Sequence, residues 1–355
     1  MERWRLNNRN ENPVLIGLIR DEIEKHGPVS FAWFMEQALY HPEHGYYSSG
    51  RCSIGRKGDY YTNVSVGSLF GRLLAAQFGE IWEQLGRIDD FVIVEQGAHD
   101  GQFARDVIES AQSRAPEFFE ALRYRIVEPF PSLRERQLQM LEPFQDKIEW
   151  WTSLAPFTGV HFSNELLDAM PVRFVGAGVE KLVDLQGDNF VFIDRPISHT
   201  PLNQAALDWI ETVATNLERG YLIAIDYGYF AEQFQGNIQI RAEHRYLDSP
   251  FQQIGQADIT MHVDWTSIVE RAEEHGLRVA GFTDQHHFLT GIISTWPDLL
   301  RDSSLSSANV NRASKPALHT LLHPEMLGRA FQVLSVVKNV DPGAPQLAGL
   351  KFARK

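Results

Sequence analysis

The chain has 355 residues, of which 43% are hydrophobic, and its 46 acidic and 33 basic residues give a net charge of −13. This length predicts about two domains, and the acidic balance disfavours a generic nucleic-acid or anionic-membrane surface. The single cysteine, Cys52, excludes an intrachain disulfide and indicates a reducing compartment. No apolar run approaches ~18 residues and residues 1–8 lack the apolar core of a signal peptide. We therefore expect a cytoplasmic protein without membrane insertion.

The N-terminal region predicts two helices followed by a long loop. The first helix starts at Pro13, after Asn12 as its cap, and Ser30 caps the second. A polar, glycine-containing loop then runs from Tyr46 to Thr62, before a helix at about 64–85. We expect this loop to cover a ligand cleft, with packing as an equal alternative for the tyrosines and a surface turn as the alternative for Gly58-Asp59. The loop residues expected at the cleft are Tyr47, Gly58, Asp59 and Thr62.

The rest of the chain alternates strand and helix signals. Strands are expected at 91–96, 123–128, 147–153, 160–165, 221–226, 277–282 and 331–338. Helices are expected at 103–113, 131–141, 202–217 and 265–275. This alternation predicts an α/β fold with a Rossmann-like sheet of seven strands and helices on both faces. We expect an N-terminal extension at 1–88 and a Rossmann-like domain at 89–355, with insertions at about 172–195, 229–262 and 286–328. The first insertion reads as a hairpin turning near Gly187, and Gly220 is expected just beyond the helix that follows.

A glycine turn follows the first strand of this sheet. A dinucleotide fingerprint requires Gly-x-Gly-x-x-Gly, whereas here Gly97 and Gly101 are four apart and His99 lies between them. The strand ends in Glu95, which suits a cation better than a pyrophosphate, and the next strand ends in Glu128, where an acid can bind ribose hydroxyls. The pattern favours S-adenosylmethionine (SAM) over NAD. The cofactor-binding residues expected in the sheet are Glu95, Gly97, Ala98, Gly101, Glu128 and Asn164.

Four acidic residues end four of the predicted strands: Glu95, Glu128, Glu165 and Asp226. Ligands bind at the carboxyl ends of parallel strands, so we expect these acids to share one functional edge, although a single acid at a strand end is usually a solvated cap. The segment from Tyr229 to His262 reads as a long irregular loop, which is typical of a lid or binding surface. The substrate-binding residues expected are Asp226, Tyr227, Arg241, His244 and His262.

Other chemistries have weaker signals. The chain has no His-Glu-x-x-His or Cys-x-x-Cys motif, so we expect no metal, and it has no Gly-x-Ser-x-Gly motif of a hydrolase. His262 and Asp264 could share a face of a strand, but an Asp264 helix cap beside a packed histidine is the better interpretation.

Several motifs together resemble the MidA-like methyltransferases, a family that includes the mitochondrial complex I assembly methyltransferase. The two most specific are Asn164-Glu165-Leu166-Leu167-Asp168-Ala169-Met170-Pro171-Val172 and Asp258-Ile259-Thr260-Met261-His262-Val263-Asp264. The others are His41-Pro42 with Gly45-Tyr46-Tyr47, Gly55 with Gly58-Asp59 and Thr62, Phe70-Gly71, Glu95-x-Gly97-x-x-x-Gly101, Val127-Glu128, Asp226-Tyr227-Gly228 and Phe331-Gln332-Val333-Leu334. The chain departs from the family at His99, where glycine is usual, at Ser65, where an acid is usual, and at Gln239, where arginine is usual.

The resemblance implies a class I SAM-dependent methyltransferase whose acceptor is an arginine of a respiratory-complex subunit. Methyl transfer requires an aligned acceptor, and a carboxylate pair can orient a guanidinium cation. We expect Glu165, Asp168 and Asn164 to do so; if the turn between them is helical, Glu165 and Asp168 share a face. The alternative is that Asn164 and Glu165 only cap the turn. Two rival functions are a non-catalytic SAM-binding assembly factor and a nicotinamide-dependent oxidoreductase. The oligomeric state stays open.

Overall fold

The computed structural model describes residues 12–50, 62–176, 178–197, 200–230, 236–243, 245–301 and 307–353, with only the backbone for 307–314. The chain forms two compact units, each built from several segments. The first unit comprises residues 1–61, 169–206 and 235–262, and the second comprises 62–168, 207–234 and 263–355.

The second unit contains a large sheet whose main path has seven strands, in the order β14-β15-β9-β5-β2-β3-β4. Their bounds are β2 Phe91–Gln96, β3 Leu122–Val127, β4 Ile148–Trp151, β5 Phe157–Asn164, β9 Leu217–Tyr229, β14 Arg278–Asp284 and β15 Phe331–Lys338. A two-residue strand, β13 Val263–Asp264, pairs with β9 in parallel and makes eight. β15 runs antiparallel to both of its neighbours, and the other pairs are parallel. The predicted α/β sheet is confirmed, with one extra short strand.

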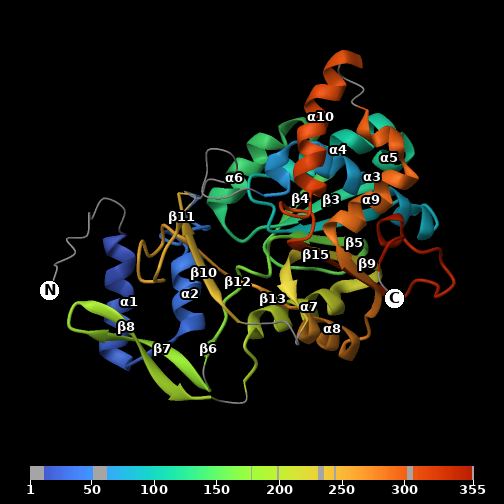
Figure 1. Ribbon diagram of the computed structural model, residues 1–355. Helices are drawn as coiled ribbons and strands as arrows, with labels where there is room; N and C mark the ends of the chain where they lie inside the picture. The colour runs from blue at the N-terminus through green and yellow to red at the C-terminus, as the bar shows by residue number, and fades with distance from the viewer. Residues whose placement is uncertain are drawn as a thin grey trace. The chain divides into compact units, whose positions relative to one another are not determined.

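Helices cover both faces of this sheet, and in Figure 1 α3 and α4 lie on one side while α7 and α8 lie on the other. The α-helices of the second unit are α3 Leu69–Gln84, α4 Gln102–Arg114, α5 Pro116–Ala121, α6 Pro131–Met140, most of α7 Gln204–Asn216, α8 Trp265–Glu274, α9 Gln285–Thr295 and α10 Ser307–Leu322. Its short 3₁₀ helices are η2 Val64–Val66, η3 Glu142–Lys147, η4 Pro297–Leu300 and η5 Ala348–Leu350. Stacked aromatic rings, such as Phe103 on Phe162 with centroids 4.4 Å apart, form the core between α4 and the sheet. Asp264 caps α8 as expected, because its Oδ1 accepts the N–H of Thr266 at 3.1 Å.

The division into units does not follow the expected boundary at residue 88. Helix α3 belongs to the second unit, since it packs on α4 so closely that a Cβ at Gly71 would lie 2.5 Å from the Cβ of Asp106. Residues 62–88 are therefore part of the second unit, which the periodicity of α3 alone did not indicate.

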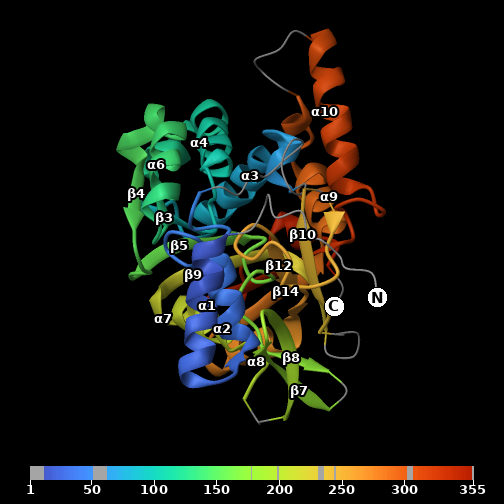
Figure 2. The same ribbon diagram turned by 90° about the vertical axis from the view of Figure 1, so that its left-hand side faces the viewer.

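The first unit joins two N-terminal helices to two small sheets. Its elements are α1 Pro13–His26, β1 Val29–Ser30, α2 Phe31–Tyr40, β6 Phe174–Gly176, β7 Val179–Gln186, β8 Asn189–Pro196, β10 Ile238–Ala242, β11 Arg245–Tyr246 and β12 Asp258–Met261. α1 and α2 lie side by side (Figure 2), and β1 adds to β7 of the predicted hairpin. Phe31, Phe34 and Phe251 pack between the helices and the sheets.

One local expectation was wrong, and another was correct only in part. The segment 229–262 is not irregular throughout, because β10 pairs with both β11 and β12 in a three-stranded antiparallel sheet. Gly220 comes after the end of α7, as expected, but it does not cap that helix. It lies inside β9 at φ +135°, opposite Gly159, where a side chain would meet the neighbouring backbone at 1.9 Å.

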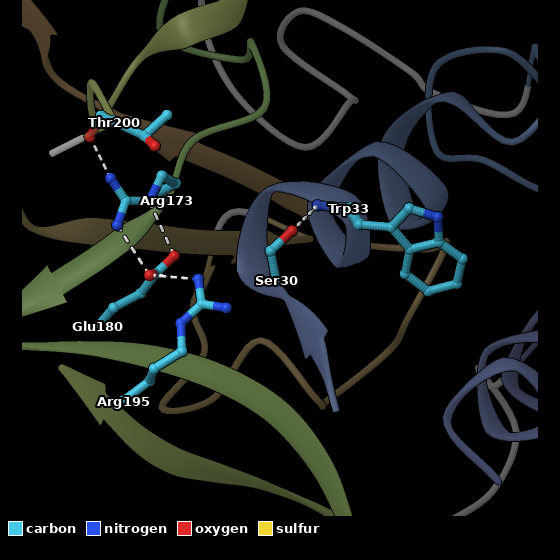
Figure 3. Close-up of polar contacts among 6 residues, drawn as sticks. All are labelled: Ser30, Trp33, Arg173, Glu180, Arg195 and Thr200. Atoms are coloured by element: carbon cyan, nitrogen blue, oxygen red, sulfur yellow. Dashed lines mark hydrogen bonds and ion pairs between the residues drawn. The ribbon is translucent and has the colours of Figure 1, made fainter. Parts of the chain in front are cut away.

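A buried ionic cluster ties the hairpin of the first unit together (Figure 3). Arg173 donates two hydrogen bonds to the Glu180 carboxylate, each 2.8 Å long, and Arg195 donates a third at 2.6 Å. Arg173 also donates to the backbone oxygen of Thr200. These arginine donors lower the pKa of the fully buried Glu180 to about 2, although burial by itself would raise that pKa.

Candidate functional site

The carboxyl ends of four adjacent parallel strands form one edge of the large sheet. The strands lie in the order β3, β2, β5, β9, and the chain passes from β2 outward to β3 and β4 and then back across to β5. The edge between β2 and β5 is therefore a topological switch point, where open α/β sheets bind their ligands. Glu128 and Glu165 come directly after β3 and β5, whereas Glu95 and Asp226 lie within β2 and β9 near their carboxyl ends. The expected shared edge is therefore confirmed, but each carboxylate has different partners.

The glycine turn after β2 bends the chain through left-handed backbone conformations. Gly97, His99 and Gly101 have φ of +81°, +46° and +86°, and the Gly101 N–H donates to the Ala98 oxygen at 2.8 Å. A Cβ at Gly97 would meet Leu166 at 3.4 Å, whereas one at Gly101 would meet Leu141 at 3.1 Å. Gly101 is thus required by packing and backbone conformation.

Glu95 at the end of β2 is buried in the sheet face that α3 and α4 cover. Its Oε2 accepts the hydroxyl of Tyr124 at 2.6 Å. Burial raises the pKa of Glu95 to about 8, and the negative charge of Asp100 adds to this, while the Tyr124 hydrogen bond opposes it. Glu95 therefore carries a proton near neutral pH unless a cation comes close to it.

Glu128, just after β3, is held by two donors. Phe130 N–H donates to Oε1 at 3.0 Å and the side-chain amide of Gln137 donates to Oε2 at 3.1 Å. Burial raises the pKa of Glu128, and these hydrogen bonds oppose the shift. A carboxylate offers about four acceptor positions, so Glu128 keeps capacity for two further hydroxyl donors.

Gln137 on α6 joins the glycine turn to Glu128. The same side-chain nitrogen that reaches Glu128 also donates to the His99 oxygen at 2.9 Å, and its Oε1 accepts the indole N–H of Trp150 at 3.1 Å. The side chain is fully buried. The sequence analysis did not predict Gln137. The feature that could have indicated it is a polar side chain at a position of α6 where the helical spacing favours a buried residue.

Asp226 at the end of β9 binds backbone rather than facing outward. Its Oδ2 accepts the N–H groups of Leu166, Leu167 and Asp168 at 3.0, 2.8 and 3.3 Å, and its Oδ1 accepts the N–H of Tyr227 at 2.8 Å. Burial raises the pKa of Asp226 to about 7 despite these four donors. The expected substrate-binding role of Asp226 is therefore corrected to a structural one: it anchors the loop that carries Glu165 and Asp168.

That loop is not a helical turn. Glu165 lies in the left-handed region at φ +54°, which costs roughly 1–2 kcal/mol for a residue with a side chain, and residues 167–170 form bends and turns. Asp168 is buried, and Glu165 is half-buried. Spacing of three therefore does not place the two carboxylates on one helical face, contrary to that expectation.

Asn164 and Glu165 belong to a chain of amide hydrogen bonds. Asn164 Nδ2 donates to Glu165 Oε1 at 2.8 Å, and Asn63 Nδ2 donates to Asn164 Oδ1 at 2.8 Å. Asn63 is fully buried, and its Oδ1 has no hydrogen-bond partner among the described residues. A buried acceptor without a donor costs about 1–3 kcal/mol. Sequence reasoning missed Asn63, which lies one residue after the predicted Thr62.

Thr62 closes the turn that contains Asn63. Its N–H donates to Ser65 Oγ at 2.9 Å, and Ser65 donates back from its own N–H to Thr62 Oγ1 at 3.2 Å and from its hydroxyl to the Thr62 oxygen at 2.8 Å. Ser65, where the resembling family has an acid, thus pairs with Thr62.

The remaining predicted residues make other contacts. The Tyr227 ring packs on Phe331 with centroids 4.0 Å apart. In the first unit, Tyr47 donates its hydroxyl to Asp258 at 2.6 Å, and Tyr46 is buried, as the packing alternative expected. Gly58, Asp59 and His244 lie outside the described residues.

Arg241 and His262 form a polar cluster around β10 of the first unit. Arg241 donates to Gln239 at 2.9 Å and lies over the Tyr246 ring at 4.6 Å, and Gln239 contacts His262 Nε2 at 3.3 Å. Burial lowers the pKa of His262, and the charge of Arg241 lowers it further. Arg241 and His262 thus come together, in the unit that does not contain the glycine turn.

The described residues show neither a metal site nor a membrane-spanning helix. They contain no group of three or more His, Cys, Asp or Glu that could hold a metal ion. None of the helices in the described ranges is long and apolar enough to cross a membrane.

Comparison with known proteins agrees with this geometry. A structure from Burkholderia thailandensis, described as a "likely methyl transferase" bound to S-adenosyl-homocysteine, is 27% identical, with a TM-score of 0.86, and covers 97% of this chain and 96% of that one. A mitochondrial "Protein arginine methyltransferase NDUFAF7" from Danio rerio is 24% identical over 92% of this chain and 87% of its own length. Its Drosophila melanogaster homolog is 26% identical over 76% and 73%.

One family model matches residues 73–283, more than half of the chain, and its description is "Putative S-adenosyl-L-methionine-dependent methyltransferase". The match spans the glycine turn, all four acidic strand ends and the loop from Asn164 to Asp168. The chain therefore belongs to this family of SAM-dependent methyltransferases, with SAM as its cofactor, as the sequence motifs predicted.

Proposed function

We propose that this protein transfers a methyl group from SAM to a side-chain nitrogen of an arginine in another protein. The observation that carries the proposal is the loop from Asn164 to Asp168, which places two carboxylates beside the switch point of the sheet. The names of the relatives from Danio rerio and Drosophila melanogaster, which specify protein arginine methylation, support the acceptor class.

The residues at the β2 and β3 ends fit the cofactor. Gly97 is exposed and would let a ligand approach the backbone, and Ala98 beside it is small. Glu128 has spare acceptor positions for the two ribose hydroxyls. Glu95 would lose its proton as the cationic cofactor approaches, because a nearby positive charge favours the ionised carboxylate. We assign cofactor binding to Glu95, Gly97, Ala98, Glu128 and Asn164, with Gly101 shaping the turn.

When bound, SAM supplies an electrophilic methyl carbon on a sulfonium. The acceptor nitrogen bonds to that carbon as the carbon–sulfur bond breaks, and the nitrogen releases one proton. Catalysis then consists mostly of alignment. Glu165 can accept two donors of a planar guanidinium and fix its orientation. Asp168, three residues further along the same loop, is buried and adds negative charge.

The other residues predicted at the site differ in the contacts that they make. Tyr47 and Thr62 have protein partners that account for their polar groups, and Asp226 serves the loop backbone. Arg241 and His262, with the exposed Tyr246, offer a polar surface of the first unit for a protein substrate. The absence of nucleic acid among the partners remains a prediction from the charge of −13. The compartment remains a prediction too: the relatives' names say mitochondrial, whereas the sequence predicted a cytoplasmic protein.

One alternative has an observation in its favour. His99 occupies a left-handed position in the glycine turn where the resembling family usually has glycine, which would suit a protein that binds SAM without transferring its methyl group. Calorimetry with SAM and with NADH, followed by transfer from methyl-tritiated SAM to lysate protein, separates the functions. We expect SAM binding, no NADH binding and label on protein. SAM binding without label would favour the assembly factor, and NADH binding would favour the oxidoreductase.

A further inference from the structure

The hydrogen bonds around Glu165 have a fixed direction. A carboxylate only accepts hydrogen bonds, so the Asn164 amide must turn its nitrogen toward Glu165 Oε1, 2.8 Å away. Its oxygen then faces Asn63, whose nitrogen donates to it at 2.8 Å. The charge of Glu165 thus sets the orientation of both amides.

This direction explains why the side-chain oxygen of Asn63 has no donor among the residues that the structure describes. Reversing the Asn63 amide would bring two carbonyl oxygens together at the contact with Asn164. Reversing both amides would direct the Asn164 oxygen at the carboxylate. The orientation that leaves Asn63 Oδ1 without a donor among the described residues is therefore the one that serves Glu165.

The backbone of Asn63 is also directed at Glu165. Its N–H lies 3.4 Å from Glu165 Oε1, and the reciprocal bonds between Thr62 and Ser65 hold the turn around it. A residue needed only for packing would be expected to satisfy both ends of its buried amide. Asn63 instead gives its donors to the Asn164–Glu165 pair.

We infer that Asn63 is a positioning residue for methyl transfer, which orients the Glu165 carboxylate directly through its N–H and indirectly through the amide of Asn164. This inference rests on the proposed function, in which Glu165 orients the acceptor. Asn63 lies outside the Asn164–Asp168 loop, so the inference adds a second segment of the chain to the site. The hydrogen bonds from this segment support Glu165, whose backbone is strained.

The test is a double-mutant cycle between Asn63 and Glu165. Asn63→Asp keeps the shape but removes the amide donor, and Asn63→Ala removes the side chain in case the added charge of the first variant has its own effect. Asn189→Asp, the same change at an exposed position of the first unit, is the control. Each protein is assayed for SAM affinity by calorimetry and for the initial rate of label transfer to lysate protein at saturating SAM.

We expect both Asn63 variants to bind SAM within about threefold of the unsubstituted protein and to transfer methyl groups about tenfold or more slowly, since lost orientation lowers rate. In a Glu165→Gln background the same substitutions should change transfer by less than about twofold, because residues that act as a unit are not additive. A merely structural Asn63 would reduce transfer equally in both backgrounds, and that result would overturn the inference.

The outcomes also separate the inference from the proposed function. If Glu165→Gln abolishes transfer while Asn63→Asp and Asn63→Ala leave it unchanged, the inference is wrong and the function stands. If Glu165→Gln transfers normally, Glu165 does not orient the acceptor, and the role of Asn63 falls with it. An unsubstituted protein that binds SAM but labels no protein would refute both.

Discussion

The carboxylate of Asp226 holds the backbone N–H of Leu167 at 2.8 Å, and with it the loop on which Glu165 and Asp168 lie. The sequence suggested that Asp226 binds the substrate. In the structure its carboxylate instead holds the loop after the neighbouring strand β5, which carries the other two acids. Acids on one edge of a sheet can have unequal roles, and their hydrogen-bond partners distinguish them.

Replacing Asp226 with Asn should loosen this loop. An amide has one oxygen for four backbone donors, and hydrogen bonds to a charged group are worth about 1.5–3 kcal/mol each. We expect Asp226→Asn to lower the unfolding temperature by several degrees and to reduce methyl transfer more than SAM affinity. Calorimetric unfolding and SAM titration of one preparation provide the check. Full transfer activity and an unchanged unfolding temperature in the Asp226→Asn variant would mean that the loop does not depend on the four hydrogen bonds to the carboxylate.

Replacing Glu128 with Ala should weaken SAM binding by about tenfold or more, because two ribose hydroxyls would lose a charged acceptor. The matched control is Glu142→Ala, an exposed acid of η3. Titration calorimetry measures both affinities. A change of less than about twofold for Glu128→Ala would assign Glu128 to the Gln137 network alone.

The raised pKa of Glu95, about 8, predicts a specific dependence of stability on pH. Between roughly pH 4.5 and pH 8 the folded protein holds a proton on Glu95 that the unfolded chain has released, so this group lowers the free energy of unfolding as the pH rises. The groups that face it are Tyr124 and Asp100. Glu95→Gln carries no charge and should gain stability relative to the unsubstituted protein from pH 5 to pH 8.5. Denaturant titrations at both pH values measure this difference; an equal difference at both would contradict the raised pKa.

The Glu180 cluster should make the first unit sensitive to acid. The pKa of Glu180 is depressed to about 2, so its contribution to stability is complete above about pH 4.5 and is lost as the pH falls toward 2. Glu180→Gln leaves Arg173 buried without its charged partner and should cost about 3–5 kcal/mol. Asp194→Asn removes the exposed ion pair with Lys181 on the same hairpin and should cost under about 1 kcal/mol. Denaturant unfolding of both variants gives the comparison, and equal losses would show that burial does not strengthen the cluster.

Much of the fold could be predicted because it depends on local patterns. The apolar runs of β2 and β9 and the helical spacing of α4 fixed the alternation of elements, and Asp264 was recognisable as a helix cap. The division into units depends on contacts between distant segments, such as α3 on α4, which one-dimensional periodicity does not contain.

The candidate site was predictable in location but less so in its details. The positions of the predicted strand ends identified four acids at the site, because the carboxyl ends of parallel strands lie at one edge of the sheet. These acids are Glu95, Glu128, Glu165 and Asp226. Which acid contacts backbone and which faces a ligand depends on loop conformation, such as the left-handed Glu165. Asn63 and Gln137 were missed because asparagine and glutamine carry no charge signal and act through partners far away in the sequence.

Gly228 belongs to a family motif for a structural reason: a side chain there would meet the backbone oxygen of Val263 in β13 at 2.4 Å.

The central claim is that this chain methylates arginine in a protein. The most direct measurement is to incubate the protein and its Glu165→Gln variant with methyl-tritiated SAM and a cell lysate, hydrolyse the labelled protein with acid, and identify the labelled amino acid. We expect the label to elute with methylarginine and the variant to incorporate at least about a hundredfold less, the usual order for lost alignment, while binding SAM normally. Label on a different amino acid, or equal labelling by Glu165→Gln, would contradict the account.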